Sequence, residues 1–154
     1  MTLVFRQYQQ ADQEAVRKLH TEGLKQFSAV MEDVNLDQDI ETIEETYVKK
    51  NGNFVVGLLD HQIVCMGAFR YFTNETAEIK RIRVDEKHQS SGLGKRTLTI
   101  LEELARSQGY SKLILDTSSK QLPAQKLFEQ NGYKETHRKQ FKELEIIFYQ
   151  KNLV

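Results

Sequence analysis

The sequence predicts an α/β fold built on a mixed, mostly antiparallel central sheet. Short stretches typical of strands alternate with amphipathic helical stretches. Three expected strands follow one another with only short turns between them, which favours antiparallel pairing. A later strand, Lys112–Asp116, follows a whole helix and contains Leu113-Ile114-Leu115, a run expected of a parallel strand buried on both faces. We therefore expect six to seven strands flanked by about four helices, in the order β-α-α-β-β-β-α-β-α-β-β.

The first part of the chain should contribute one strand and two helices. Leu3–Tyr8 alternates between apolar and polar residues, and Asp12 is a good N-cap for the helix that follows. Residues 28–36 are expected to form a loop. A second helix should begin at about Asp37 and stop at Asn51-Gly52. The apolar residues in helical phase are Ala15, Val16, Leu19 and Leu24 in the first helix, and Leu36, Ile40, Ile43 and Tyr47 in the second.

Strands are expected over residues 53–59 and 63–72, joined by the turn Asp60-His61-Gln62, and then over 78–84. The next helix should run to about Ser107, end at Gly109 and bury Leu93, Ile100, Leu101 and Leu104. After Lys112–Asp116, a short helix should start near Pro123 and close at Gly132. Two final strands are expected near 133–138 and 144–150, and the sequence does not reveal how they pair.

Composition and charge exclude several classes of function. Among 154 residues, Lys+Arg and Asp+Glu both total 22, so no overall charge favours nucleic acid or an anionic membrane. The longest apolar runs are far short of a membrane span, and the N-terminus does not resemble a signal peptide. We expect one domain covering residues 1–154, with neither nucleic-acid nor membrane partners.

The cysteine and histidine residues favour structural roles. The one cysteine, Cys65, excludes an internal disulfide and fits a reducing compartment, so a cytoplasmic location is expected. Its place in the middle of a strand favours a small buried hydrophobic residue over a nucleophile. The spacing of the histidines does not match a ligand set, and no metal site is expected; these residues are His20, His61, His88 and His137.

The stretch 78–95 predicts an anion site. It reads as a strand, a tight turn and the first turn of a helix, with Gly92 and Gly94 where the turn becomes helical. The first N–H groups of a helix have no intrahelical partners, and glycines let a phosphate approach them closely. The spacing does not fit a P-loop. A dinucleotide fingerprint needs a third glycine where Thr97 stands. The simplest ligand is a pyrophosphate.

Gln89-x-x-Gly92-x-Gly94 after a strand resembles the acetyl-coenzyme A signature of the GNAT-type N-acetyltransferase superfamily. That signature is usually written Arg/Gln-x-x-Gly-x-Gly/Ala. A second superfamily signature, Asn-x-x-Ala-x-x-Leu-Tyr followed by Gly-Phe, is partly matched at 121–133. Ala124, Leu127 and Gly132 fit this second signature, whereas Gln121, Phe128 and Tyr133 are substitutions. The order of the two signatures, the strand between them and the chain length are all similar to this superfamily.

The resemblance implies acetyl-CoA as cofactor, coenzyme A as product and a sheet that splays after the central strand. It implies that the pantetheine arm lies along the strand ending at Ile82-Arg83-Val84. Gln121 would hydrogen-bond the arm, and Ala124 and Phe128 stand at signature positions of the same cofactor site. The pyrophosphate would rest on the backbone N–H groups of Gln89, Ser90, Ser91, Gly92, Leu93, Gly94 and Lys95.

Acetyl transfer to an amine is helped by a general base or a water chain, and Glu78 is the best candidate for the base. It stands eleven residues before Gln89, which is similar to the placement of the base in histone-acetylating relatives. Strand alternation puts Glu78 in phase with Lys80, Ile82 and Val84, unless a bulge intervenes. The alternative is a surface glutamate paired with Lys80 or Arg70. The resemblance also implies a backbone N–H near Ile82–Val84 that stabilises the oxyanion.

The leaving thiolate is where the chain departs from the superfamily pattern. Many relatives carry a tyrosine as general acid at the position of Phe128, and phenylalanine has no proton to give. Tyr133 is a conceivable substitute, although its position ordinarily takes a core phenylalanine. The loss of this tyrosine keeps a second function in view, a coenzyme A-binding module without catalysis. A third is an unrelated α/β nucleotide-binding protein.

The acceptor is expected to be a small-molecule or peptide amine, and a homodimer remains open. An acidic neighbourhood near the start of the second helix would suit a cationic amine, although the helix dipole alone also favours acids there. Lys80, Arg81 and Arg83 would meet an acidic acceptor or phosphates, or form an exposed basic strand. The acidic residues are Glu32, Asp33, Asp37, Asp39 and Glu41.

Overall fold

The computed structural model describes residues 2–26 and 34–153. These residues contain seven strands in one sheet, in the order β1-β2-β3-β4-β5-β7-β6. The pair β4 and β5 is parallel and every other neighbouring pair is antiparallel. The predicted mixed, mostly antiparallel sheet is confirmed. The strands are Leu3–Gln7 (β1), Asn53–Leu59 (β2), Gln62–Tyr71 (β3), Thr76–Val84 (β4), Lys112–Ser118 (β5), Lys134–Phe141 (β6) and Leu144–Asn152 (β7).

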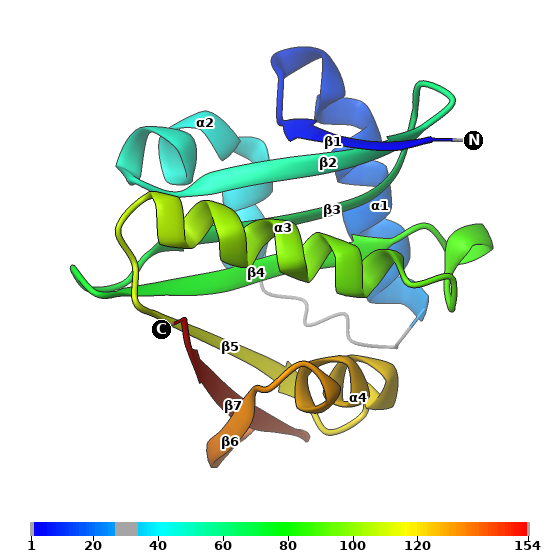
Figure 1. Ribbon diagram of the computed structural model, residues 1–154. Coiled ribbons are helices and arrows are strands. Elements are labelled where there is room, and N and C mark those ends of the chain that lie inside the picture. Colours follow the sequence, from blue (N-terminus) through cyan, green and yellow to red (C-terminus); the bar gives the residue numbers. More distant parts are fainter. Residues whose placement is uncertain (1, 27–33, 154) are drawn as a thin grey trace.

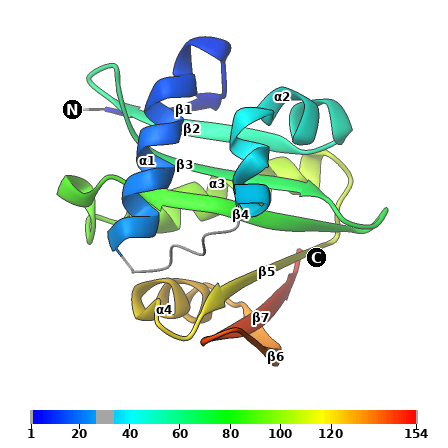
Figure 2. The same cartoon turned by 180° about the vertical axis from the view of Figure 1, so that it is seen from behind.

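Helices cover both faces of the sheet. In Figures 1 and 2, α1 and α2 lie on one face and α3 lies on the other, while α4 lies beside β5. None of the helices in the described segments is long and apolar enough to cross a membrane. The α-helices are Gln13–Gln26 (α1), Ile43–Thr46 (α2), Leu93–Ser107 (α3) and Leu122–Gln130 (α4), and the 3₁₀ turns are Gln10–Asp12 (η1), Val34–Glu41 (η2), Val48–Lys50 (η3) and Glu86–His88 (η4).

The start of the first helix differs from the prediction. Asp12 does not cap α1 from outside; it ends the turn η1, and its carboxylate accepts a hydrogen bond from the backbone N–H of Gln9 over 2.8 Å. Arg6 holds the same carboxylate at 2.7 Å. The α-helix itself begins at Gln13, directly after Asp12, but the chain begins to coil at Gln10, three residues earlier than the side-chain pattern indicated.

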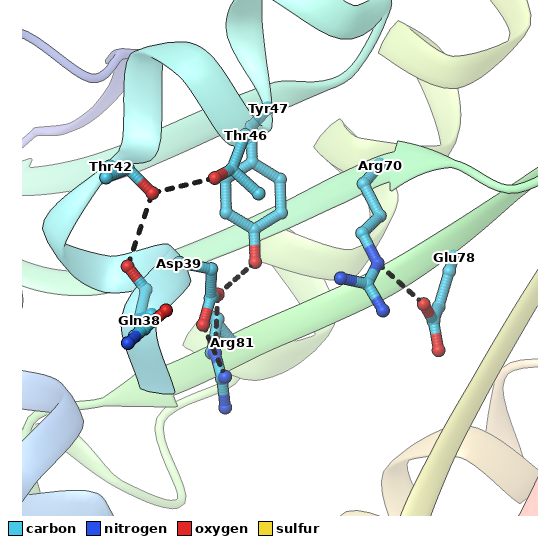
Figure 3. A network of polar contacts seen from close by, with 8 residues as sticks. All are labelled: Gln38, Asp39, Thr42, Thr46, Tyr47, Arg70, Glu78 and Arg81. Carbon is cyan, nitrogen blue, oxygen red and sulfur yellow. Dashed lines mark hydrogen bonds and ion pairs between the residues drawn. The ribbon is translucent and has the colours of Figure 1, made fainter. Parts of the chain in front are cut away.

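The predicted continuous second helix is wrong. Val34–Lys50 is divided into η2, α2 and η3, and only Ile43–Thr46 is α-helical. The break falls at Thr42, whose hydroxyl bonds to the carbonyl of Gln38 and to Thr46 (Figure 3), because such side-chain bonds compete with the helical ladder. The predicted stop is confirmed, since Asn51 is left-handed at φ 57°. Of the loop predicted at 28–36, residues 28–33 lie outside the described residues, and 34–36 begin η2.

Two apolar clusters hold the helices against the sheet. On the α3 face, Leu98 and Leu101 pack with residues of β4, β5 and β7, together with Phe128 of α4. On the other face, Val16 of α1 and Tyr47 pack with residues of β2 and β3. The two final strands form a hairpin, with β7 between β5 and β6. The sheet is therefore covered on both faces around β3 and β4.

Candidate active site

The sheet opens between β4 and β5. The two strands pair only at Thr76–Glu78 against Lys112–Ile114. Beyond that point β5 stays paired with β7 as far as Ser118, and β4 stays paired with β3 as far as Val84. Figures 1 and 2 show β5 turning away from β4. In the described parts of the chain, the edge of β4 that faces β5 has no strand partner from Ile79 onwards, so its backbone can pair with another extended chain.

A bulge in β4 lies where the two strands part. Met66 of β3 pairs with Arg83, and Ala68 pairs with Lys80, so β4 has one more residue than β3 between these pairs. Arg81 adopts a φ of 60°, in the left-handed region that residues other than glycine rarely take. Such a bulge interrupts the alternation of side chains between the two faces of a strand.

The bulge corrects the predicted facing of β4. Ile82 packs in the same cluster as Ile79, on the α3 face, and Val84 packs beside Leu93, the first residue of α3. Glu78 precedes Ile79 and so points to the opposite face. Ile82 and Val84 therefore do not share a face with Glu78, because the bulge shifts the alternation. The face of β4 that carries Glu78 is polar.

An ion pair with Asp39 of η2 holds the bulged residue Arg81 (Figure 3). The Nε of Arg81 donates to Asp39 Oδ2 over 2.9 Å and its Nη2 to Oδ1 over 2.7 Å; the side chains are 11% and 10% exposed. The hydroxyl of Tyr47 donates to the same carboxylate. Burial alone would raise the pKa of Asp39, but the bonds from Arg81 and Tyr47 outweigh it and the pKa is lowered. Burial and then this carboxylate raise the pKa of Tyr47.

Glu78 lies on the face that carries this ion pair, and Arg70 holds it (Figure 3). The Nε of Arg70 donates to Glu78 Oε1 over 2.8 Å, and the Glu78 side chain is 15% exposed. The pairing with Arg70 that the sequence offered as an alternative is therefore present. Within the described residues, the other carboxylate oxygen of Glu78 has no hydrogen-bond partner. The role of Glu78 as general base stays a prediction.

Lys80 and Asp116 complete the charged face. Lys80 is half-buried and Asp116, in phase with Ile114 opposite Glu78, is exposed. Neither forms a hydrogen bond or ion pair with any other described residue. Burial and the nearby positive charge of Arg70 lower the pKa of Lys80. Although Asp116 contacts solvent, protein atoms surround much of its carboxyl group, and this desolvation, followed by the charge of Glu78, raises its pKa.

The turn after β4 contains two residues in the left-handed conformation. Ser90 and Gly92 are both left-handed, at φ 63° and 83°. Gly92 is the N-cap of α3, and a Cβ added there would meet no atom within 4 Å. The hydroxyl of Ser91 donates to the carbonyl of His88, and the side-chain amide of Gln89 donates to a β4 carbonyl. Alternating left-handed residues ahead of a helix N-terminus turn successive N–H groups toward one ligand.

The two signature segments contact each other. Gly94 lies in the first turn of α3, where a Cβ would lie 3.3 Å from the Cδ2 of Leu127 on α4. Gln121 is the residue before α4, and its side-chain oxygen accepts a hydrogen bond from the hydroxyl of Thr117 over 2.6 Å. Ala124 packs against the core of the α3 face. The proposed cofactor contacts of Gln121 and Ala124 stay predictions.

The aromatic residues of the second signature lie in the core. Phe128 is 6% exposed, and its ring centroid lies 6.0 Å from that of Tyr133 and 5.9 Å from that of Tyr149. The hydroxyl of Tyr133 donates to Glu102 of α3 over 2.7 Å. Burial and then the Glu102 charge raise the pKa of Tyr133. Its hydroxyl is therefore committed to α3, which disfavours the role of substitute acid.

Two side chains on β5 were missed by sequence reasoning. Ser118 is buried, and within the described residues its hydroxyl has no hydrogen-bond partner. It is in phase with Asp116 along the strand. No local pattern marks these two residues, because polar side chains commonly follow the apolar run of a strand. No group of three or more His, Cys, Asp or Glu side chains suited to a metal ion occurs in the part of the chain that the structure describes.

Known proteins share the fold of this chain. The chain is 22% identical to an acetyltransferase of the GNAT family from Staphylococcus aureus Mu50, with a TM-score of 0.89 over 99% of this chain and 100% of that one. The protein yncA from Salmonella typhimurium, solved with its cofactor acetyl-CoA, is 20% identical with a TM-score of 0.78, over 100% of this chain and 95% of that one. These likenesses establish the fold.

Sequence relatives are longer than this chain. N-acetyltransferase 8 of Homo sapiens is 32% identical over 110 residues, which are 68% of this chain and 48% of that protein. N-acetylaspartate synthetase of Rattus norvegicus is 32% identical over 101 residues, 64% of this chain and 34% of that protein. The chain thus spans half or less of these relatives. The model of the acetyltransferase (GNAT) family matches residues 13–133, most of the chain, and the protein therefore belongs to that family.

Proposed function

We propose that this protein transfers an acetyl group from acetyl-CoA to a primary amine, with both molecules bound at once. The observation that carries the proposal is the open edge of β4 next to the left-handed turn at Ser90 and Gly92. The names of two kinds of relative describe acetylation at nitrogen. Two structural neighbours, yncA and a GNAT family acetyltransferase from Elizabethkingia anophelis, were solved with acetyl-CoA.

The residues at the opening fit the chemistry of acetyl-CoA. The unpaired edge of β4 around Ile82–Val84 offers backbone donors and acceptors to the amides of the pantetheine arm. The N–H groups of 89–95 suit a diphosphate. The hydroxyl of Ser118, buried and without a described partner, suits an amide of the arm. When bound, acetyl-CoA supplies a thioester, the activated acetyl group. A backbone N–H near Ile82–Val84 would stabilise the developing oxyanion.

The carboxylates on the other face of the opening suit proton removal. An amine with a pKa of about 10.4 is almost fully protonated at pH 7. Glu78 would accept this proton, directly or through water, at the oxygen that Arg70 does not hold. Asp116 is the second carboxylate on this face. Its raised pKa makes it the competing candidate for the base.

Phe128 supports an alternative function, a coenzyme A-binding module without catalysis. Its buried ring cannot protonate the leaving thiolate. Releasing a thiolate whose conjugate acid has a pKa of about 8.5 costs only roughly 2 kcal/mol at pH 7. General acid help is typically worth about 10²–10⁴-fold. We therefore expect catalysis that is slower than in an enzyme with the tyrosine, with water as the proton donor.

Ligand binding and thiol release test the proposal. Acetyl-CoA at 100 times its Kd should stabilise the protein by about 2.7 kcal/mol, whereas ATP and NAD should not. Thiol release should then depend on an added amine. Binding without release by any of a broad amine panel would establish the binding module instead. If acetyl-CoA does not bind, the proposal fails.

Substitution identifies the base. Glu78→Gln should lower kcat and flatten its rise with pH, because the amine then loses its proton only to solvent. Glu103→Gln, an exposed change on α3, is the matched control and should leave both unchanged. If Glu78→Gln has no effect and Asp116→Asn has this effect, Asp116 is the base. Unchanged kinetics in both variants would remove the carboxylates from the mechanism.

We further propose that residues 1–154 act as one catalytic domain in the cytoplasm. Cys65 is buried, and burial raises the pKa of its thiol, which supports a role in packing.

We also propose that the chain assembles as a homodimer. Light scattering of the purified chain would measure the mass of the assembly. A mass near the 18.0 kDa of one chain would contradict the dimer.

A further inference from the structure

The charges around the opening are nearly all paired. Around Glu78, on its face of the sheet, lie three cations and three anions, and a fourth cation, Arg83, lies past the bulge of β4 against Gly23 of α1. Two ion pairs, Arg70 with Glu78 and Arg81 with Asp39, account for four of the six. The expected acidic neighbourhood is weakened in the same way, because Arg81 neutralises Asp39, and Arg17 pairs with Glu41. The remaining two charged groups are Lys80 and Asp116.

These two residues face the same opening from opposite strands. Lys80 lies on β4 directly before the bulge, and Asp116 lies on β5 beyond the last paired residues. They interact electrostatically but form no ion pair with each other. The half-buried ammonium of Lys80 has three donors and no hydrogen-bond partner among the described residues. Among the described residues, Lys80 and Asp116 are thus a cation and an anion without ion-pair partners on the two sides of the opening.

An ammonium without a negative group of its own fits this arrangement poorly. It would be attracted by Asp116 and Glu78, but Lys80, with Arg70 and Arg81 behind it, would repel it. A molecule that also carries a carboxylate removes this repulsion, because the carboxylate accepts charge-assisted hydrogen bonds from Lys80.

We propose that the acceptor is a small molecule with a carboxylate beside its amine, as in a free α-amino acid, and that Lys80 binds the carboxylate while Glu78 and Asp116 face the amine. This inference rests on the proposed function. It names a substrate class and a residue that selects it.

The test compares free amino acids with their α-amides. Leucine, glutamate and lysine, each beside its α-amide, are assayed by thiol release from acetyl-CoA. Chemistry alone favours the amides, because an α-amino group beside an amide loses its proton at about pH 7.7–8.0. We nevertheless expect the best free acid to exceed its amide in kcat/KM by about tenfold or more, since a hydrogen bond to a charged group contributes that much.

Lys80→Met should lower kcat/KM for the best free acid by about tenfold or more, mainly through KM, and should not lower it for the amide, whose ammonium Lys80 repels. Lys80→Arg should restore much of the preference, because it keeps the positive charge. Lys134→Met, an exposed change on the edge strand β6, is the control and should change nothing. Titration of the same free acid into the coenzyme A complex measures the binding loss without turnover.

Three results would overturn the inference. One is equal use of free acid and amide by the unsubstituted protein. Another is a loss in Lys80→Met that is equal for both members of the pair. The third is failure of all six compounds while other amines are acetylated. Each leaves the proposed function standing, which fails separately if acetyl-CoA does not bind or if no amine releases thiol.

Discussion

Two largely buried carboxylates on opposite faces of the sheet each have a tyrosine and a cation as partners. They differ in their structural role, because only one of them supports the candidate active site. Each accepts one hydrogen bond from a tyrosine hydroxyl and pairs with one cation, and each is 10% exposed. The groups are Asp39 with Arg81 and Tyr47, and Glu102 with Lys151 and Tyr133.

The difference in role comes from the cation, which is Arg81 in the first group and Lys151 in the second. Arg81 is bulged and left-handed, which costs about 1–3 kcal/mol unless the surroundings enforce it. Its guanidinium binds Asp39 through two bonds and cannot lose its proton. Lys151 makes a single bond of 3.0 Å, is 25% exposed and joins β7 to α3 away from the opening. The first group therefore shapes the candidate active site, while the second ties helix to sheet.

The largest expected effect comes from Asp39→Asn. Removing one charge leaves Arg81 buried beside a neutral amide, and breaking a buried pair costs about 3–5 kcal/mol. The free energy of unfolding, from urea titration, measures this loss. Acetyl transfer should fall as well, because the bulge loses its support.

The control for this change is Glu41→Gln. Glu41 also pairs with an arginine, Arg17, but the two side chains are 53% and 48% exposed. Such pairs contribute about 0–1 kcal/mol. Equal losses in the two variants would show that burial of the Asp39 pair does not matter.

Acid should remove the advantage of Asp39. Its pKa in the folded protein lies below the ordinary value of 3.8, so its contribution is complete above that value and disappears as the pH falls through the folded pKa. The difference in melting temperature between the unsubstituted protein and Asp39→Asn should thus be constant near neutrality and shrink below pH 3.8. A constant difference down to pH 2 would contradict the assignment. Charges shared by both proteins cancel in this comparison.

Glu102→Gln should cost less than Asp39→Asn. Hydrogen bonds to charged groups contribute about 1.5–3 kcal/mol, and Lys151 can turn to solvent once its partner is neutral. Urea unfolding measures the loss, and the Kd for acetyl-CoA should stay the same. A weaker Kd would mean that this group, too, sets the separation of β4 and β5.

Sequence patterns predicted the elements that local chemistry determines. The glycines at 92 and 94 and the apolar run Leu113–Leu115 located the turn, the helix and the parallel strand. The broken second helix was missed, because Ile40, Ile43 and Tyr47 keep helical phase whether or not the backbone between them is helical. Periodicity reports which side chains are buried and does not report the hydrogen-bonding pattern.

Only the part of the site that depends on local sequence could be predicted. The anion-binding turn depends on residues adjacent in sequence. The bulge at Arg81 depends on Asp39, 42 residues away, and no local pattern indicates that pair. The hydroxyl of Ser118 became notable only once its surroundings were known. Charges that pair between elements distant in the sequence are therefore the least predictable part of the site.

The smallest expected effect on stability comes from replacing either of two left-handed glycines by alanine. The backbone strain is the same in both variants, but only one of the two glycines lies beside the opening. Gly92 begins α3 beside the opening and Gly109 follows its other end; both are left-handed, and a Cβ on either would meet no atom within 4 Å. Replacing either one by alanine should cost about 1–2 kcal/mol from backbone strain alone. Only Gly92→Ala should also weaken acetyl-CoA binding, because its methyl group occupies the space that a diphosphate needs. Calorimetric titration of both variants separates strain, which they share, from contact with the ligand, and an equal Kd in both would place the diphosphate elsewhere.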